Sequence, residues 1–413
     1  MLKLFAKAWA MRPPLALRIR LLRWMARSAM REFPWAIALA LVVVIAIAIR
    51  LGALGGWAGA LVVALLGLAV IALARLAWQA LASARGVREA LAELEPPDDE
   101  RRSRFPTSHL LVPPLMLWPR GVRRLRGVEY ARHGRKSLHL DVFMPAEPPG
   151  DEPRPAIVQV HGGGWIAGTR NEQGIPLLNH LAAHGWVGFN ADYRLSPRAT
   201  FPDHVVDVKR ALAWVREHAA DYGADPDFVC ITGGSAGGHL SALAALTADD
   251  PELQPGFEDA DTSVAAAVPF YGVYDLTDPG TVYYPELREW VLERNVFKTR
   301  FADDPERFRA ASPTHRVRAD APPFLVIHGE CDTLVPVADA RRFVAALREA
   351  SESPVLYAEL AGAEHAFDIV PSVRTARVVE TIERFWPPFA PTRRLPRHWR
   401  RSVRFPAANP SGG

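Results

Sequence analysis

Residues 230–239 read CITGGSAGGH, a short β-branched run that leads into Ser235 between paired glycines. This layout is typical of a strand that turns sharply into a helix and exposes a serine at the turn. Glycines two positions before and two positions after the serine let the backbone pack there without Cβ clashes. A glycine-rich turn with a surface serine is the competing interpretation, because the motif also arises by chance. A nucleophilic Ser235 therefore requires partners elsewhere in the chain.

A run of three glycines lies upstream of this motif. Residues 156–160 (AIVQV) read as a short buried strand, and they are followed by HGGGW at residues 161–165. An oxyanion hole needs backbone N–H groups aimed at one point, and residues without side chains let a substrate carbonyl approach them. We therefore predict Gly163 and Gly164 as donors, with Ala236, the residue after the serine, as the third.

An acid follows another predicted strand, residues 324–327. Asp332 lies on the loop that leaves this strand, and we expect it to orient a histidine and to stabilise its cationic form. Glu330 and Asp275 are rivals for this role. Asp332 is preferred because it lies directly before a predicted helix that opens near Val337.

A histidine completes the order Ser, Asp, His that this kind of site requires. His365 lies on the turn after the predicted strand at residues 355–360. We predict that it is the general base that takes the Ser235 proton and returns it to the leaving group. The other twelve histidines are expected to be structural.

From about Val122 to Phe389 the chain resembles an α/β-hydrolase, and it is most similar to the hormone-sensitive-lipase-like carboxylesterases with their H-G-G-G and G-x-S-A-G-G signatures. The resemblance implies a mostly parallel eight-stranded sheet with helices on both faces. It also implies a structural role in the floor of the site for NADYRLSP at residues 190–197, Phe201-Pro202 and Asp207. Many family members carry Asp where this chain has Gly234, which leaves the subgroup open.

Apolar periodicity independently predicts the same fold class. Short runs rich in valine and isoleucine alternate with amphipathic helical stretches, a pattern typical of a parallel α/β sheet. An antiparallel hairpin at residues 125–133 and 137–143 is expected to open this sheet. The predicted strands lie at 156–160, 187–191, 228–232, 264–271, 324–327 and 355–360, and two of the predicted helices lie at 205–219 and 337–350.

A charged, aromatic insert interrupts this pattern at about residues 275–321. It contains Tyr283, Tyr284, Trp290, Phe297 and Phe308. In the family it resembles, an insert at this place forms part of a lid over the acyl pocket. A solvated helical decoration is the alternative interpretation.

Two long apolar segments precede the predicted hydrolase. Residues 33–49 and 51–74 carry no charge, and Arg50 separates them. Because about 20 apolar residues cross the hydrocarbon core, with a range near 17 to 25, both segments qualify as spans. We expect a transmembrane helical hairpin rather than a single span or a signal peptide, whose apolar core is shorter and lies closer to the N-terminus.

The charges near this hairpin predict its orientation. Residues 1–31 contain eight lysines and arginines and no acid, which by the positive-inside rule keeps the N-terminus cytoplasmic. Two spans then return the chain to the same side. The expected protein is therefore a multi-pass inner- or plasma-membrane protein with a cytoplasmic hydrolase, which would face outward if the first segment did not span.

Charge also separates the two ends of the chain from its middle. The net charge is +4, yet the N-terminal arm holds eight basic residues and the tail 391–413 holds six, so the remainder is net acidic. Basic ends fit attraction to anionic membrane lipids, and no nucleic-acid motif is present. The expected division is 1–95 for the arm and hairpin, 96–120 for a linker, 121–390 for the hydrolase and 391–413 for a basic tail, for which disorder is an alternative.

These observations predict a membrane-anchored serine carboxylesterase that takes short- to medium-chain acyl esters, with acylglycerols as a further option. Two cysteines form no disulfide or metal framework, and no cofactor motif is present, so neither cofactor nor metal is expected. An arylformamidase or a prenylcysteine methylesterase on the same scaffold is an alternative. A non-catalytic ligand binder or a membrane scaffold with a decayed hydrolase is another, although the presence of His365 argues against a ligand binder.

Overall fold

The computed structural model describes residues 10–52, 56–92 and 121–385, apart from residues 149, 151, 249, 283 and 384. The predicted linker at 96–120, the basic tail at 391–413 and Tyr283 of the insert lie outside the described residues.

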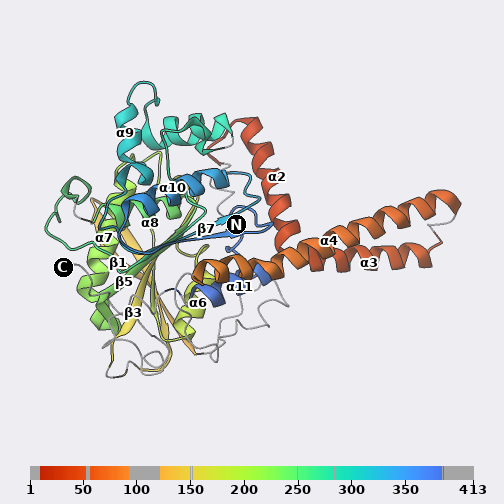
Figure 1. Cartoon of the computed structure of the whole chain (residues 1–413), viewed down its shortest axis with the longest axis horizontal. Helices are drawn as coiled ribbons and strands as arrows, with labels where there is room; N and C mark the ends of the chain where they lie inside the picture. The colour runs from red at the N-terminus through yellow and green to blue at the C-terminus, as the bar shows by residue number, and fades with distance from the viewer. Residues whose placement is uncertain are drawn as a thin grey trace, which may run out of the picture.

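An eight-stranded sheet forms the centre of the molecule (Figure 1). Its strand order is β1-β2-β4-β3-β5-β6-β7-β8, in which β2 is antiparallel to both neighbours and the strands from β4 to β8 are parallel. This arrangement confirms the expected α/β-hydrolase sheet. The strands are β1 (Val122–His133), β2 (Lys136–Pro145), β3 (Arg154–Val160), β4 (Val187–Ala191), β5 (Ala224–Gly234), β6 (Ala267–Phe270), β7 (Phe324–Gly329) and β8 (Val355–Leu360).

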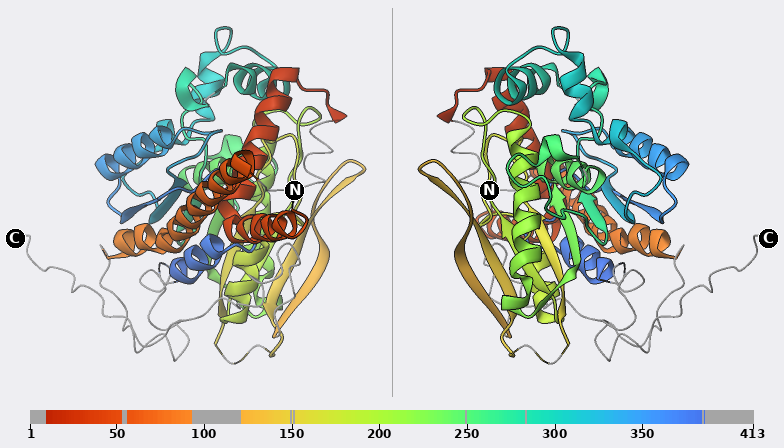
Figure 2. Two further views of the ribbon diagram at one scale, coloured as in Figure 1. Left: turned by 90° about the vertical axis from the view of Figure 1, so that its right-hand side faces the viewer. Right: turned by 90° about the vertical axis from the view of Figure 1, so that its left-hand side faces the viewer.

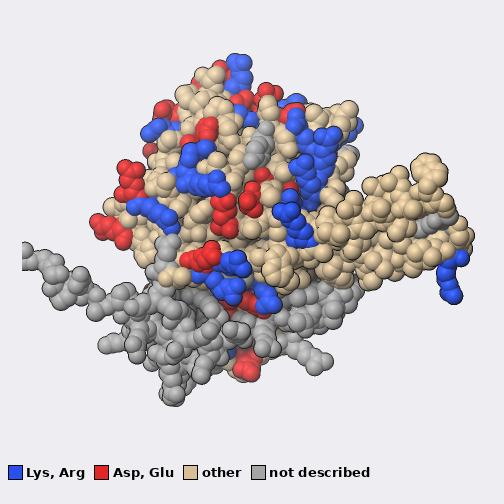
Figure 3. Space-filling model, turned by 45° about the vertical axis from the view of Figure 1, so that its right-hand side comes forward, with Lys and Arg blue, Asp and Glu red and all other residues tan. Residues whose placement is uncertain are grey.

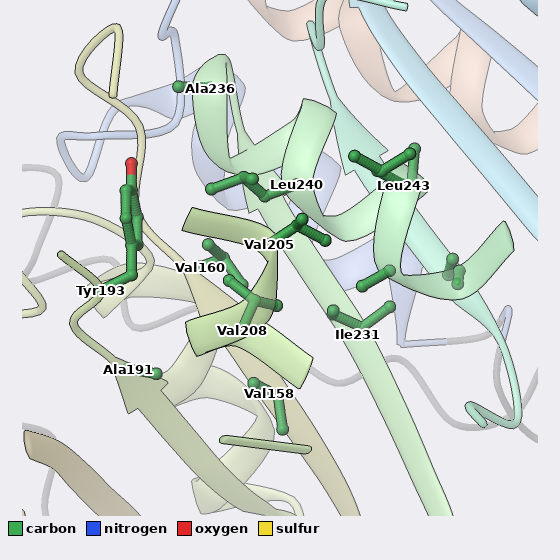
Figure 4. Packing of buried hydrophobic residues seen from close by; sticks show 14 of the residues in the cluster. Val158, Val160, Ala191, Tyr193, Val205, Val208, Ile231, Ala236, Leu240 and Leu243 are labelled. Atoms are coloured by element: carbon green, nitrogen blue, oxygen red, sulfur yellow. The ribbon is translucent and has the colours of Figure 1, made fainter. Parts of the chain in front are cut away.

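Helices cover both faces of the sheet, because neighbouring strand residues point to opposite sides and both sides are apolar. Ile157 belongs to one buried cluster and Val158 to the other. Figure 4 shows the cluster that contains Val158. In it, Leu240 and Leu243 pack beside Val205 and Val208 above the strands. The helices of the hydrolase are α6 (Ile175–Ala183), α7 (Asp203–His218), α8 (Ala236–Leu246), α9 (Pro305–Ala310), α10 (Val337–Ala350) and α11 (Val373–Ile382), with a π-helix, η4 (Leu287–Phe297), in the insert.

Three helices precede the sheet: α2 (Leu15–Glu32), α3 (Pro34–Arg50) and α4 (Gly56–Leu91). α3 packs against the first half of α4, and the pair projects from the body as a rod (Figure 1). By length and composition α4 is able to cross a membrane, and the bent pair of α2 and α3, at 87° to each other, passes the same test jointly. The two apolar segments predicted from the sequence thus form a helical pair, with α3 ending at Arg50.

The N-terminal region is more closely joined to the hydrolase than the predicted division implies. α2 lies along the side of the body rather than extending from it as a basic arm (Figure 2). The last turns of α4 belong to the hydrolase core, where Val87 and Ala90 join the cluster that contains Ile157. The α/β body therefore includes α2 and the end of α4, and only the projecting rod is separate.

Candidate active site

Ser235 occupies the turn between β5 and α8, with φ 58° and ψ −121°. This left-handed conformation is rare for a residue with a side chain. The flanking glycines are required by close backbone contacts: a Cβ at Gly233 would lie 2.5 Å from the Gly237 carbonyl oxygen, and one at Gly237 would lie 2.1 Å from that of Val160. The glycine spacing thus has the steric cause predicted from the sequence.

The structure brings the three predicted catalytic side chains together in one hydrogen-bonded chain. The His365 Nε2 lies 2.9 Å from the Ser235 Oγ, and its Nδ1 lies 2.6 Å from the Asp332 Oδ2. Because a carboxylate only accepts, Nδ1 carries the proton and Nε2 is free to accept from the serine hydroxyl. The rival acids lie elsewhere: Glu330 accepts from the Gly362 N–H, and Asp275 accepts from Thr277.

Asp332 is buried and well supplied with donors. Its Oδ1 accepts from the backbone N–H groups of Leu334 and Val335, at 2.9 Å each, and the His328 Nε2 lies 3.2 Å from its Oδ2. Burial alone raises the pKa of Asp332, but the charge of His365 and the hydrogen bonds from His328 and His365 outweigh it and hold this pKa below its usual value. The carboxylate thus stays ionised and keeps His365 in the tautomer that can accept a proton.

Two of the predicted oxyanion-hole residues share a cavity with Ser235, and the third follows it in the chain. Gly163 and Gly164 adopt left-handed φ angles of 119° and 59°, and both line the same cavity as Ser235. Ala236 is the first residue of α8, where backbone N–H groups have no partner within the helix. The Ala236 N–H group therefore has no acceptor within α8 and lies next to Ser235 in the chain.

Tyr271 occupies the space beside Gly234 and explains the departure from the family pattern. A Cβ at Gly234 would lie 2.5 Å from the Tyr271 hydroxyl, so the Asp that many family members carry has no room here. The Tyr271 hydroxyl donates to Asp368, and its ring lies 4.7 Å from the His365 ring, centre to centre. Tyr271 therefore supports the histidine from the side of β6.

Two further residues that the sequence analysis missed hold the histidine loop. The Trp24 Nε1 donates to the His365 carbonyl oxygen at 3.2 Å, across 341 positions in the chain. The buried Glu364 accepts from the backbone N–H groups of Thr333 and His365, and thereby joins the acid loop to the histidine loop. In the sequence, only the position of Glu364 next to His365 indicates its role. No local pattern identifies Trp24 as a support of the histidine loop.

A mainly apolar cavity of about 160 Å³ adjoins Ser235 and His365. One wall comes from α2, and another comes from the insert through η4. Arg20 of α2 pairs with Glu286 of the insert at 3.3 Å, so the two walls are joined. The wall residues from these two segments are Leu17, Leu21, Trp24, Val282, Leu287, Trp290, Val291 and Leu292, and Pro13 before α2 adds to them.

The segment after β4 has the structural role that the resemblance implies. The Tyr193 hydroxyl donates to the His161 carbonyl oxygen, and the two rings stack with centres 4.4 Å apart. The Arg194 Nε donates to the buried Asp207 at 2.8 Å. The first contact holds the start of the loop that carries the glycine run, and the second joins the segment after β4 to α7.

The buried His239, which lies near the site, has a structural role, as expected. The His239 Nδ1 accepts from the Trp165 Nε1, and its Nε2 donates to the Ala311 carbonyl oxygen at 2.7 Å. Burial lowers the pKa of His239 to about 4, so the ring is neutral and braces Trp165 at the cavity wall.

One group of side chains has the composition of a metal site. His180 of α6, His184 at the C-cap of that helix and Glu383 after α11 offer ligand atoms within 4.8 Å of one another. The His180 Nε2 lies 2.9 Å from Glu383, which a histidine–carboxylate hydrogen bond explains without a metal. None of the three residues lines the cavity at Ser235.

Comparisons with known proteins agree with this fold. Residues 140–347 match the model of the BD-FAE family. The chain is 50% identical over 258 residues to the probable carboxylic ester hydrolase LipM of Mycobacterium tuberculosis, which covers 62% of this chain and 59% of that protein. The chain thus spans about three fifths of the length of this relative.

A solved structure and a more distant relative extend the comparison. Esterase 2 of Thermogutta terrifontis with butyrate bound has a TM-score of 0.52 and 31% identity, covering 64% of this chain and 91% of that chain. A probable isoprenylcysteine alpha-carbonyl methylesterase of Oryza sativa subsp. japonica is 29% identical over 236 residues, which is 54% of this chain and 53% of that protein.

Proposed function

Because the chain belongs to the BD-FAE family, we propose that it is a membrane-anchored serine carboxylesterase that cleaves carboxylic esters through an acyl-enzyme. The observation that carries this proposal is the hydrogen-bonded chain from Ser235 through His365 to the buried Asp332. The esterase names of its relatives support the same reaction class.

In the proposed first step, the Ser235 Oγ attacks the ester carbonyl carbon while His365 takes the hydroxyl proton at Nε2. Asp332 stabilises the resulting imidazolium, and the N–H groups of Gly163, Gly164 and Ala236 stabilise the oxyanion. Collapse of this intermediate breaks the bond to the alcohol oxygen, which receives the proton from His365. Water then attacks the acyl-enzyme with His365 again as base, and the carboxylic acid leaves Ser235 free.

The cavity supports a short acyl group as the preferred substrate. Its volume of about 160 Å³ is close to that of an engineered cavity of roughly 150 Å³ that binds benzene, a molecule of six carbons. The bound butyrate of the Thermogutta terrifontis esterase is of the same class. We therefore propose esters with acyl chains up to about six carbons as substrates.

The apolar rod supports the proposed anchor. Its exposed surface is apolar along its length, and Arg50 lies at its end (Figure 3). Trp57 and Trp78 of α4 are 83% and 68% exposed. At 1.5 Å per residue they lie about 31 Å apart, which matches a hydrocarbon core about 30 Å thick with tryptophans at its two surfaces. The eight lysines and arginines among residues 1–31 favour a cytoplasmic hydrolase.

A prenylcysteine methylesterase is the second candidate, because the Oryza sativa relative carries that name. Turnover of p-nitrophenyl butyrate, a prenylcysteine methyl ester and N-formylkynurenine by the purified full chain separates the candidates. We expect the highest kcat/KM with p-nitrophenyl butyrate. A higher value with either of the other two compounds would assign the chain to the methylesterases or to the arylformamidases.

A further inference from the structure

Helix α2 carries two apolar stripes on opposite faces. Leu17, Leu21 and Trp24 form the inner stripe and line the cavity at Ser235. The outer stripe faces solvent and follows helical spacing, and Leu22 within it is 52% exposed. Its members are Leu15, Ile19, Leu22 and Ala26. A helix with an apolar face that no described residue covers needs a partner for that face.

The direction of α2 relative to the rod identifies the kind of partner. α2 and α3 meet at 87°, and α2 runs along the side of the body from which the rod projects (Figure 1). If the rod crosses a bilayer along its normal, α2 lies in the plane of the bilayer surface. The outer stripe then faces the lipid, and the body lies behind it.

The charges on α2 fit this position. Arg23 and Arg27 are exposed and flank the outer stripe, and Figure 3 shows a band of basic side chains beside the base of the rod. Helices that lie in the membrane interface combine an apolar face with lysines and arginines that contact headgroups. Anionic headgroups attract each such residue.

We propose that the outer face of α2 binds the surface of an anionic bilayer, so that one helix separates the lipid from the acyl cavity and bilayer-dissolved esters are the substrates. This inference rests on the proposed membrane-anchored esterase. On its other side, α2 holds the histidine loop, because Trp24 donates to the His365 carbonyl and Arg31 donates to that of Gly362 at 2.7 Å.

The test places a fluorophore on the outer stripe of the full-length protein in vesicles. An azide-bearing amino acid at Leu22, coupled to an environment-sensitive dye, reports the depth of this position through quenching by nitroxide-labelled lipids. The matched control carries the same dye at Glu217 of α7, an exposed position on the opposite side of the body (Figure 1). The vesicles contain phosphatidylcholine with or without phosphatidylglycerol.

We expect headgroup-level nitroxides to quench the dye at position 22 and not the dye at position 217. We also expect the double variant Arg23→Gln/Arg27→Gln to weaken this docking about fivefold per arginine in vesicles that contain phosphatidylglycerol. Equal, weak quenching at both positions would overturn the inference. Hydrolysis of dissolved p-nitrophenyl butyrate by the same samples reports the proposed esterase separately, since that substrate does not require the bilayer.

Discussion

The backbone at Ser235 holds a left-handed conformation that costs on the order of 1–3 kcal/mol for a residue with a side chain. The packing of α8 against α7 and the sheet offsets this strain and fixes the turn (Figure 4). The turn aims the serine Oγ at His365. The buried carboxylate of Asp332 then keeps the imidazole oriented without help from solvent.

At the residue scale, the contact between Gly234 and Tyr271 gives a sharp test. Gly234→Ala places a methyl group against the Tyr271 phenol and pushes this ring toward His365. We expect the melting temperature to fall, since overpacking costs roughly 1–3 kcal/mol of folding free energy, and we expect ester turnover to fall as the ring beside His365 shifts. The control is Gly150→Ala, where an added Cβ meets nothing within 4 Å. Wild-type kcat and melting temperature in Gly234→Ala would contradict the account.

The sequence predicted Ser235, Asp332 and His365 because each follows a recognisable strand in a fixed order. It did not predict Trp24 or Tyr271 as supports of the histidine, because both act through contacts between distant segments. The choice of Asp332 over Glu330 followed from loop position, and the structure explains it: Glu330 already accepts from Gly362. Side-chain direction on a loop is not encoded in local periodicity.

At the scale of elements, a buried ion pair fixes the end of α2 to α11. Glu32 accepts from the Arg374 Nε at 3.0 Å and from the Ser372 hydroxyl at 2.6 Å. Arg374 also donates to Ser83 of α4 and to the carbonyl of Ala361. Burial raises the pKa of Glu32, while the charge of Arg374 opposes this shift. Three elements and the histidine loop thus meet at one guanidinium group.

Arg374→Met should therefore destabilise the protein strongly, by about 3–5 kcal/mol, because it leaves the Glu32 carboxylate buried without a partner. The double variant Glu32→Met/Arg374→Met should cost less than Arg374→Met alone, since no charge then remains buried. Thermal unfolding in detergent measures both. The control is Arg300→Met, which breaks an exposed pair with Asp303 and should leave the melting temperature nearly unchanged. A double variant no more stable than Arg374→Met would count against the ion pair.

Asp339, in the first turn of α10, predicts a dependence of stability on pH. Burial raises the pKa of Asp339 to about 6, although Tyr274, Thr281 and Arg342 oppose the shift. The unfolded value is about 3.9, so the stabilisation from this group is full below about pH 4 and is lost as the pH rises through 6, a change of about 3 kcal/mol.

Asp339→Asn removes this titration and leaves an acceptor for the Tyr274 N–H. Between pH 4 and pH 8 the melting temperature of the variant should rise relative to that of the wild type by about 6 °C or more. Scans at matched ionic strength measure this difference. A constant difference across the range would show that Asp339 does not titrate as described.

The elements themselves were largely predictable. The strands at 187–191 and 355–360 and the helix at 337–350 have the predicted bounds, because their apolar periodicity is strong. β6 is shorter than the predicted 264–271 and ends at Phe270, since Tyr271 adopts a left-handed φ of 37°. α2 was not predicted as part of the body. Its arginines suggested a basic arm, and its contacts with the histidine loop connect residues more than 300 positions apart.

At the scale of the whole molecule, α2 and the insert enclose the cavity from outside the central sheet. The insert and the start of α2 lie at the same end of the body in both views of Figure 2. The walls of this cavity therefore come from segments that the parallel sheet does not contain. The sequence could not predict acyl specificity, because the walls meet only in the folded molecule.

An acyl-chain series of p-nitrophenyl esters tests this enclosure. Turnover should be highest for acyl chains up to about six carbons and should fall for longer chains. Leu17→Ala enlarges the cavity from the α2 side, so its optimum should shift to longer chains. Leu22→Ala, on the outer stripe of the same helix, should keep the wild-type optimum. Identical profiles for all three proteins would show that α2 does not form the acyl wall.

The central claim is that Ser235 is the nucleophile of an ester hydrolase. Labelling with a fluorophosphonate probe, followed by peptide mass spectrometry and ester assay of the same sample, tests this claim most directly. We expect one adduct per chain, on Ser235, with a parallel loss of p-nitrophenyl butyrate hydrolysis, and neither labelling nor hydrolysis in folded Ser235→Ala. Absence of an adduct on the folded wild-type protein, or full hydrolysis by Ser235→Ala, would contradict the account.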